Sequence, residues 1–289
     1  MTADRGGAGS GGAVARLTWQ APDPTALADD LRQRLGVSIV TSPASELAFL
    51  VPLGNAVLDL VPWQREASGD EPQPGGRLVL EPVLEPGQAG TASQLASPVP
   101  KVSDPADADL SLELAGIAWA TVDLDRAARE LGPWLRAEHA PRHAEPMPLR
   151  VRPNRAGSHT DALDPVSRPT PEPHLGARAI VRATNGLPGE AIVLAEPTTE
   201  GRLAASLARH DEGPVALYLR PAAGLDAWVG AARARQVSVS ARRDGPLGPQ
   251  VLVLPAADAS SAVGRAGTIG AAMVGPHLIV VGHAAPRCW

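Results

Sequence analysis

The sequence has few aromatic residues, one cysteine and one lysine. Aromatic residues make up only 3% of its 289 residues, so leucine, valine and alanine must fill the core. Cys288 is the only cysteine, which excludes a disulfide or a cysteine zinc site within one chain. Lys101 is the only lysine, and the net charge of -5 argues against a nucleic-acid partner, because phosphate binding needs clustered cations.

Long apolar runs are also absent. None approaches the roughly 20 consecutive apolar residues that a membrane-spanning helix needs, so we expect no membrane partner. Residues 1–15 are rich in Gly and lack an apolar centre, which predicts a flexible tail and not a signal peptide. With neither kind of segment, the expected location is cytoplasmic.

The stretch 189–220 shows the clearest order of elements, and we use it as the reference for the rest of the sequence. It predicts a strand, a helix and a second strand, because two apolar runs flank a segment whose leucines recur on one helical face. Its parts are the strand 191–195, the helix cap Thr198 or Thr199, the helical face of Leu203 and Leu207, and the strand 215–219. We interpret this stretch as the connection between two similar sheet modules.

The same order of elements, βαβββ, recurs three times along the sequence. The first unit covers residues 16–63, where Asp23 is the predicted N-cap of the helix and Gly36 its end. Two further units lie within residues 113–289. Repetition of one motif is a stronger indication than any single element. It predicts an α+β fold in which βαβββ modules pair through mixed sheets and form a cleft.

Two segments between the predicted elements differ in composition. Residues 64–112 are rich in Pro and Gly with acidic side chains, which predicts a linker, and residues 153–174 are rich in Pro, His and Asp, which predicts a disordered insertion. Strands at 148–152 and 237–240 are predicted as the second strands of the middle and last units. Because the unit 16–63 has no twin within the chain, we expect it to pair with another unit or with a second copy in a homodimer.

Several segments resemble the vicinal oxygen chelate superfamily, which includes glyoxalase I, bleomycin-resistance proteins, methylmalonyl-CoA epimerase and extradiol-type dioxygenases. Residues 116–125 resemble its first strand and helix start, residues 53–62 its fourth strand, and residues 191–219 its link between modules. The resemblance covers most of the chain outside residues 1–15, 64–112 and 153–176. It implies a ligand site in the cleft between paired modules.

The usual chemistry of that superfamily needs a divalent metal, held by a His on each first strand and a Glu on each fourth strand. Under the resemblance, the first-strand positions hold Arg16, Gly116 and Ala216, and the fourth-strand positions hold Asp59, Val193 and Ile279. Only Asp59 is a metal-binding residue type, and one carboxylate does not make a site. We therefore expect no metal and no cofactor.

Four residues remain as candidates for ligand binding, namely Arg16, Asp59, Tyr218 and Arg220, and Asp59 and Tyr218 are also candidates for catalysis. Strand alternation places Arg220 on the same face as Tyr218, and this pair suits a carboxylate or phosphate. The alternatives are an Asp59 that pairs with Arg16 or faces outward, and a packed Tyr218 beside a solvated Arg220. The histidines of the Pro-rich region, among them His174, match no metal-site spacing.

These features predict a glyoxalase-like protein that binds a small, mostly apolar molecule in the module cleft without a metal, as bleomycin-resistance proteins sequester a drug. The alternative is an enzyme of the same superfamily acting on an acyl or keto substrate, as a lyase, an isomerase or epimerase, or a dioxygenase-like enzyme. A third hypothesis is a degenerate paralogue that serves as a structural partner.

Overall fold

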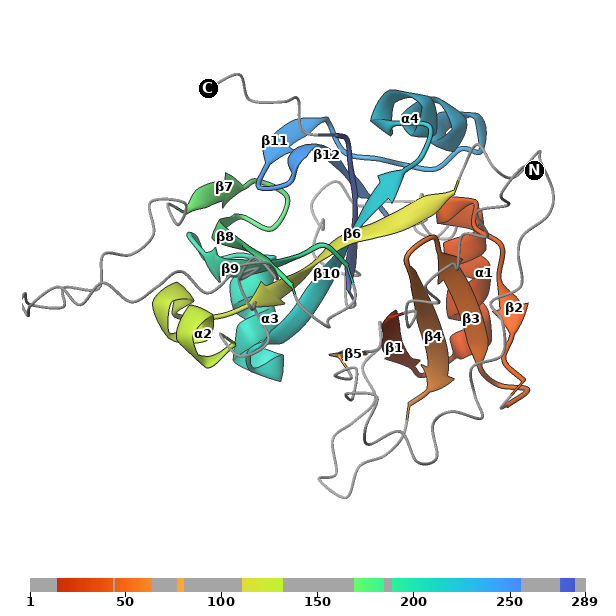
Figure 1. Ribbon diagram of the computed structural model, residues 1–289, viewed down its shortest axis with the longest axis horizontal. Coiled ribbons are helices and arrows are strands. Elements are labelled where there is room, and N and C mark those ends of the chain that lie inside the picture. Colours follow the sequence, from red (N-terminus) through yellow and green to blue (C-terminus); the bar gives the residue numbers. More distant parts are fainter. Residues whose placement is uncertain are drawn as a thin grey trace, which may run out of the picture.

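The computed structural model describes residues 15–43, 45–63, 77–80, 111–131, 169–184, 189–255 and 276–283. These residues form two mixed β-sheets with a few helices packed on them (Figure 1). One sheet has five strands in the order β2-β3-β4-β1-β5, and the other has eight in the order β11-β12-β13-β10-β6-β9-β8-β7. The α+β class predicted from the sequence is confirmed.

The first module builds most of the five-stranded sheet. It consists of β1 (Ala15–Ala21), α1 (Pro24–Leu35), β2 (Val40–Thr41), β3 (Phe49–Leu53) and β4 (Ala56–Pro62). β4 lies parallel to β1, and β3 pairs antiparallel with β4. Alternation along β1 turns Leu17 and Trp19 into the core that α1 covers, so Arg16 and Thr18 lie on the opposite face.

Helix α1 begins and ends where the sequence predicts. The side chain of Asp23 accepts a hydrogen bond from the backbone N–H of Ala26 at 2.9 Å, which satisfies one of the unpaired amides of the first turn. Gly36 follows the helix with a φ of 69°, a left-handed conformation that glycine adopts without strain. Leu31 and Leu35 lie one turn apart and are both buried.

The eight-stranded sheet contains the other two modules. The second module is β6 (Leu112–Ala120), α2 (Leu124–Glu130), β7 (Thr170–Glu172), β8 (Ala177–Ala183) and β9 (Ala191–Pro197). The third is β10 (Gly213–Pro221), α4 (Leu225–Ala234), β11 (Arg243–Gly245), β12 (Gly248–Val253) and β13 (His277–Val281), and α3 (Arg202–His210) connects the two. The first strands β6 and β10 pair antiparallel, and each fourth strand lies parallel to its first. Pairing of βαβββ modules through a mixed sheet is therefore confirmed.

Strand β5 (Arg77–Leu80) occupies the remaining edge of the first module. It pairs antiparallel with β1, in the place that β10 takes beside β6 in the eight-stranded sheet. Its residue Leu78 is buried in the core. The edge through which the first module would pair with a twin is thus filled by the same chain, and a second copy pairing there would have to displace β5.

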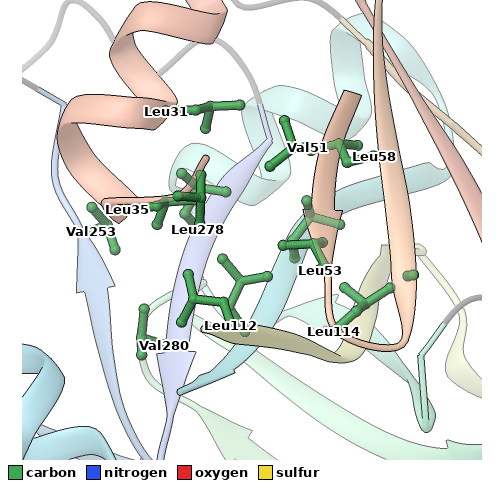
Figure 2. Packing of buried hydrophobic residues seen from close by; sticks show 14 of the residues in the cluster. Leu31, Leu35, Val51, Leu53, Leu58, Leu112, Leu114, Val253, Leu278 and Val280 are labelled. Carbon is green, nitrogen blue, oxygen red and sulfur yellow. The ribbon is translucent and has the colours of Figure 1, made fainter. Parts of the chain in front are cut away.

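The first module packs against one face of the eight-stranded sheet, which we call the outer face. The opposite face is called the inner face. Figure 2 shows the shared core between the two sheets, which includes Leu31, Leu35, Leu53, Leu112, Leu114, Leu278 and Val280. Asn55, in the turn after β3, donates from its side-chain amide to the carbonyl of Leu114 at 2.9 Å and accepts from the Leu114 N–H at 2.8 Å. One continuous core therefore joins the two sheets.

The second strand of the second module differs from its prediction. Strand β7 lies inside the stretch 153–174, for which the composition predicts disorder, so that prediction is wrong for residues 170–172. The predicted strand 148–152, residues 153–168 and most of the predicted linker 64–112 lie outside the described residues. A Pro-rich segment can still form a short edge strand, because an edge strand needs hydrogen bonds on one side only.

Two further local predictions are wrong. In the third module the second strand is β11, and Val239 makes only an isolated bridge to Val253. The N-cap of α3 is Gly201, without a side-chain hydrogen bond, and not Thr198 or Thr199. Instead, the hydroxyl of Thr198 donates to the carbonyl of Gly176 at 3.0 Å and ties β9 to the turn before β8.

Among the described helices, none is long and apolar enough to cross a membrane.

Candidate functional site

The inner face of the eight-stranded sheet consists mainly of small and apolar side chains. Leu203 and Leu207 of α3 pack against it. Its alanines are Ala115, Ala118, Ala120, Ala177, Ala179, Ala195 and Ala216. Glu172, Tyr218 and Gln250 are polar side chains on this face, and all three are fully buried. They are therefore the candidate residues for ligand binding or catalysis on this face.

The edges of the eight-stranded sheet meet at these polar residues. The edge strands β7 and β11 contact each other, so the sheet curls toward a closed barrel. Glu172 comes from β7 in the second module and Gln250 from β12 in the third, and their side chains are hydrogen-bonded across the junction. We call this junction between β7 and β12 the seam. It joins the two modules on the side opposite to the β6–β10 pair.

The carboxylate of Glu172 accepts hydrogen bonds from three groups. The Tyr218 hydroxyl donates to Oε2 at 2.8 Å, and Nε2 of Gln250 donates to Oε1 at 2.7 Å and to Oε2 at 2.9 Å. The backbone N–H of His174 donates to Oε1 at 3.0 Å. A buried carboxylate costs several kcal/mol unless hydrogen bonds compensate it, so these donors explain how the apolar face tolerates it.

Tyr218 is held in its protonated form. Burial raises the pKa of Tyr218 well above its ordinary value, and the charge of Glu172 and the hydrogen bond to it act in the same direction. The hydroxyl therefore remains a hydrogen-bond donor throughout the physiological range. The Tyr218 hydroxyl therefore serves as a fixed hydrogen-bond donor and not as an acid that titrates.

Gln250 is packed tightly against the hairpin between β11 and β12. A Cβ atom at Gly245 would lie 2.4 Å from Nε2 and Oε1 of Gln250, so glycine leaves the space that the carboxamide fills. Nε2 faces Glu172, whereas Oε1 is buried and has no hydrogen-bond partner among the described residues. An unsatisfied buried acceptor costs about 1–3 kcal/mol. The carboxamide is therefore a positioned donor that retains an unused acceptor.

His174 makes a second contact across the seam. Its Nε2 lies 3.3 Å from the backbone carbonyl of Gln250, so the ring donates to that carbonyl when Nε2 carries the proton. Burial lowers the pKa of His174 below 6.5, and the positive charge of Arg243 lowers it further. The carbonyl of Gln250 and the carboxylate of Glu172 partly oppose this shift. The neutral ring is the form that suits the closed seam.

This shift predicts a loss of stability in mild acid. Because the folded-state pKa of His174 lies below the unfolded value of 6.5, its contribution is complete above about pH 6.5. It is lost as the pH falls through the lower folded-state pKa. We expect the melting temperature of the wild-type chain to fall more between about pH 7.5 and pH 5 than that of His174→Gln, which keeps a side-chain donor but cannot titrate. Equal slopes for the two chains would contradict this assignment.

The predicted ligand-binding residues Arg16 and Asp59 lie on the first module. They face away from the shared core, and Nε of Arg16 is 3.4 Å from Oδ2 of Asp59. This ion pair is the predicted alternative to a ligand site at these residues. Neither residue lies on the eight-stranded sheet, so the structure does not bring them together with Tyr218 and Arg220.

The predicted pair Tyr218 and Arg220 alternates on β10, but the two side chains have different partners. Tyr218 is fully buried and bonded to Glu172. Nη1 of Arg220 lies 2.7 Å from Oε2 of Glu190, and its side chain is 20% exposed. The packed tyrosine of the alternative interpretation is therefore present, whereas the arginine is paired and only partly solvated.

The positions that the resemblance assigns to metal ligands are filled in a different way. At Gly116 a Cβ atom would lie 2.7 Å from the backbone carbonyl oxygen of Ala191, so this position has no room for any side chain. Val193, Ala216 and Ile279 lie on the inner face within the apolar cluster. Among the described residues, no group of three or more His, Cys, Asp or Glu side chains is placed to hold a metal ion.

Sequence reasoning missed the central residue of this site. Glu172 and His174 fall in a Pro-rich segment that resembles a disordered loop in composition. Gln250 precedes the apolar run 251–253, and alternation with Leu252 could have placed it on the inner face. For Glu172 the sequence contains no comparable signal, because its partners lie 46 and 78 residues away.

Another buried polar residue, Thr121, belongs to a separate cluster. Its hydroxyl donates to Oε1 of Glu212 at 2.8 Å, and the N–H of Val122 donates to the same oxygen at 2.8 Å. Arg126 of α2 forms an ion pair with Glu212. These contacts fix the start of α2 to the start of β10, so the cluster has a structural role.

Comparison with known proteins reveals similarity of fold only. No protein-family model matches the sequence, and no curated protein matches it. Methylmalonyl-CoA epimerase from Mycobacterium tuberculosis is similar at 18% identity and a TM-score of 0.39, over 60% of this chain and 89% of that chain. The Streptomyces coelicolor methylmalonyl-CoA epimerase in complex with 2-nitronate-propionyl-CoA is similar at 19% identity and a TM-score of 0.35, over 58% and 96%. A hypothetical protein from Bacillus halodurans C-125 is similar at 11% identity and a TM-score of 0.37, over 62% and 99%.

The fold is glyoxalase-like. This follows from the strand order, in which βαβββ modules pair through their first strands. The glyoxalase-like pair in this chain carries an additional module on its outer face. Chemistry on its inner face must follow from the residues of this chain.

Proposed function

We propose that the glyoxalase-like pair of modules binds a small, mostly apolar molecule on its inner face, without a metal. The observation that carries this proposal is the buried Glu172–Tyr218–Gln250 cluster on a mainly apolar face. Ligand sites typically combine apolar walls with a few fixed polar groups that orient the ligand. Here the fixed groups are a hydroxyl, a carboxamide and a carboxylate.

A ligand would enter by opening the seam. Glu172, Tyr218, Gln250 and the neighbouring Ala216 have no exposed surface, so this part of the inner face is closed in the structure. Strand β7 has three residues and pairs in the sheet only with β8. Short edge strands belong to the least stable parts of a fold. Movement of β7 away from β12 would uncover Tyr218 and Gln250 together.

The chemistry of the cluster supports binding without a metal. Both oxygens of Glu172 already accept hydrogen bonds from neutral donors. Nε2 of Gln250 and the Tyr218 hydroxyl act as donors toward this carboxylate, and a metal ligand must instead offer a lone pair. The donor set therefore fits recognition through hydrogen bonds.

A neutral apolar fluorophore tests the proposal. We expect N-phenyl-1-naphthylamine to bind saturably, with equal affinity in EDTA and in added divalent metal. Glu172→Gln removes the charge at the seam and should tighten binding by making opening easier, whereas Glu130→Gln, on exposed α2, should leave it unchanged. Absence of saturable binding by the wild-type chain and by Glu172→Gln would reject the proposal, and a requirement for metal would reject its metal-independent form.

The enzyme alternative is favoured by one specific observation, the buried carboxylate. Glu172 would be a candidate general base for an acyl or keto substrate bound beside it at the open seam. Methylmalonyl-CoA in D2O tests this alternative, because proton abstraction exchanges its α-hydrogen for deuterium. Exchange catalysed by the wild-type chain and lost in Glu172→Gln would replace the binding proposal with the enzyme alternative.

A further inference from the structure

We propose that Tyr218 and Gln250 form a binding pair for a small carboxylate, and that Glu172 is the internal carboxylate that occupies this pair in the closed structure. The inference deepens the proposed function, on which it rests for the location of the ligand, by naming the ligand class. It follows from the placement of the cluster: the two donors lie on interior strands of the sheet, whereas the carboxylate of Glu172 lies on the edge strand β7.

The two donors are held by interior strands. Tyr218 lies on β10, between β6 and β13, and Gln250 lies on β12, between β13 and β11. Tyr218 is fully buried, and the carboxamide of Gln250 is confined by Gly245. The strands that carry both donors are therefore held in the sheet independently of β7. The site that would receive a carboxylate is built from parts that remain when Glu172 leaves.

The acceptor, Glu172, lies on the edge strand β7. Glu172 is the last residue of β7, which is three residues long, and its carboxylate takes hydrogen bonds from hydroxyl, carboxamide and backbone N–H donors. All of these donors are neutral, and hydrogen bonds from neutral donors to a carboxylate are weaker than those of an arginine fork. A ligand carboxylate could replace that of Glu172 with the hydrogen bonds from Tyr218 and Gln250 and with the same charge.

The size of the ligand follows from the side chain that it replaces. Glu172→Ala removes a CH2–COO⁻ group, which is acetate in volume and charge, and leaves the Tyr218 and Gln250 donors unpaired. Unpaired buried donors carry a desolvation cost that an added acceptor removes. Acetate is therefore the probe for the variant, with formate and propionate as its shorter and longer relatives.

Chemical rescue of Glu172→Ala tests the inference. We expect sodium acetate to raise the melting temperature of Glu172→Ala by about 5 °C at saturation, with a hyperbolic dependence on concentration. Equal concentrations of sodium chloride or of neutral acetamide should not reproduce the rise. The wild-type chain and Glu130→Ala, in which an exposed carboxylate is removed, should respond to acetate as they do to chloride. An equal response of Glu172→Ala to acetate and to chloride would overturn the inference.

Double variants assign the effect to the proposed pair. Glu172→Ala/Tyr218→Phe and Glu172→Ala/Gln250→Leu should each lose most of the acetate response, because each lacks one donor. If Glu172→Ala does not fold in chloride, refolding from urea in acetate and in chloride replaces the melting experiment. Recovery of native circular dichroism only in acetate supports the inference, and no recovery in either salt overturns it.

The experiment separates this inference from the proposed function. Fluorophore binding without acetate rescue would support the apolar binding site and reject the carboxylate-binding pair. Acetate rescue without fluorophore binding would support the carboxylate-binding pair and reject binding of an apolar molecule. Absence of both would reject the two proposals together.

Discussion

Gln250→Glu is expected to lower the free energy of unfolding by about 3–5 kcal/mol near pH 8, as for a buried charge without compensation. The new carboxylate would stand where Nε2 of Gln250 now lies, 2.7 Å from Oε1 and 2.9 Å from Oε2 of Glu172. Two buried carboxylates at this distance cannot both ionise, so the folded variant must take up a proton that its unfolded chain does not hold at this pH. The loss should therefore shrink as the pH falls toward about 5. Urea unfolding at several pH values measures this difference from the wild-type chain.

Gln250→Met is the matched control, because methionine keeps the approximate shape of the side chain and adds no charge. It removes the donors to Glu172 and should cost about 1–3 kcal/mol, the range for leaving one buried group unsatisfied. Relative to the wild-type chain, the loss of unfolding free energy in Gln250→Met should stay the same as the pH falls, whereas the loss in Gln250→Glu should shrink. Wild-type stability of Gln250→Glu at pH 8 would mean that Gln250 does not hold Glu172 across the seam.

The sequence predicted those parts of the fold that depend on short-range patterns. Asp23 and Gly36 delimit α1 because a cap and a left-handed glycine act within one turn of the helix. Leu17 and Trp19 alternate into the core because side chains of a strand alternate between its faces. The repeated βαβββ order then followed from such patterns, read three times along the chain.

The candidate site could not be predicted in this way. Glu172, Tyr218 and Gln250 come from three strands of two modules and meet only because the edges of the sheet curl together. The composition around Glu172 points to disorder, whereas in the structure the segment pairs with β8 and contacts Tyr218 and Gln250 across the seam. The sequence identifies Tyr218 as a candidate and groups it with Arg220 on the same strand, whereas in the structure it is bonded to Glu172 on a distant strand.

The extra module is expected to unfold together with the glyoxalase-like pair, since one core joins them. Leu53 of β3 is 2% exposed, and Figure 2 shows it beside Leu112 and Leu114 of β6. The next residue, Gly54, donates its N–H to the carbonyl of Leu112 at 2.9 Å. Leu53→Ala should therefore lower the free energy of unfolding by about 2–5 kcal/mol, the range for a buried leucine. Leu47→Ala, at a position that is 63% exposed, should change it by less than about 0.5 kcal/mol.

Two tryptophans report on the two sides of this core. Trp19 lies on β1 of the first module and Trp228 on α4 of the third, and both are buried in the shared cluster. In variants that retain either Trp19 or Trp228 as the only one of the six tryptophans, urea unfolding followed by fluorescence should give coincident transitions, because a shared core unfolds in one cooperative step. Adding Leu53→Ala should shift both transitions equally, although the mutated residue belongs to the first module. A shift of the Trp19 transition alone would show that the first module is an independent unit and that its contacts with β6 contribute little to stability.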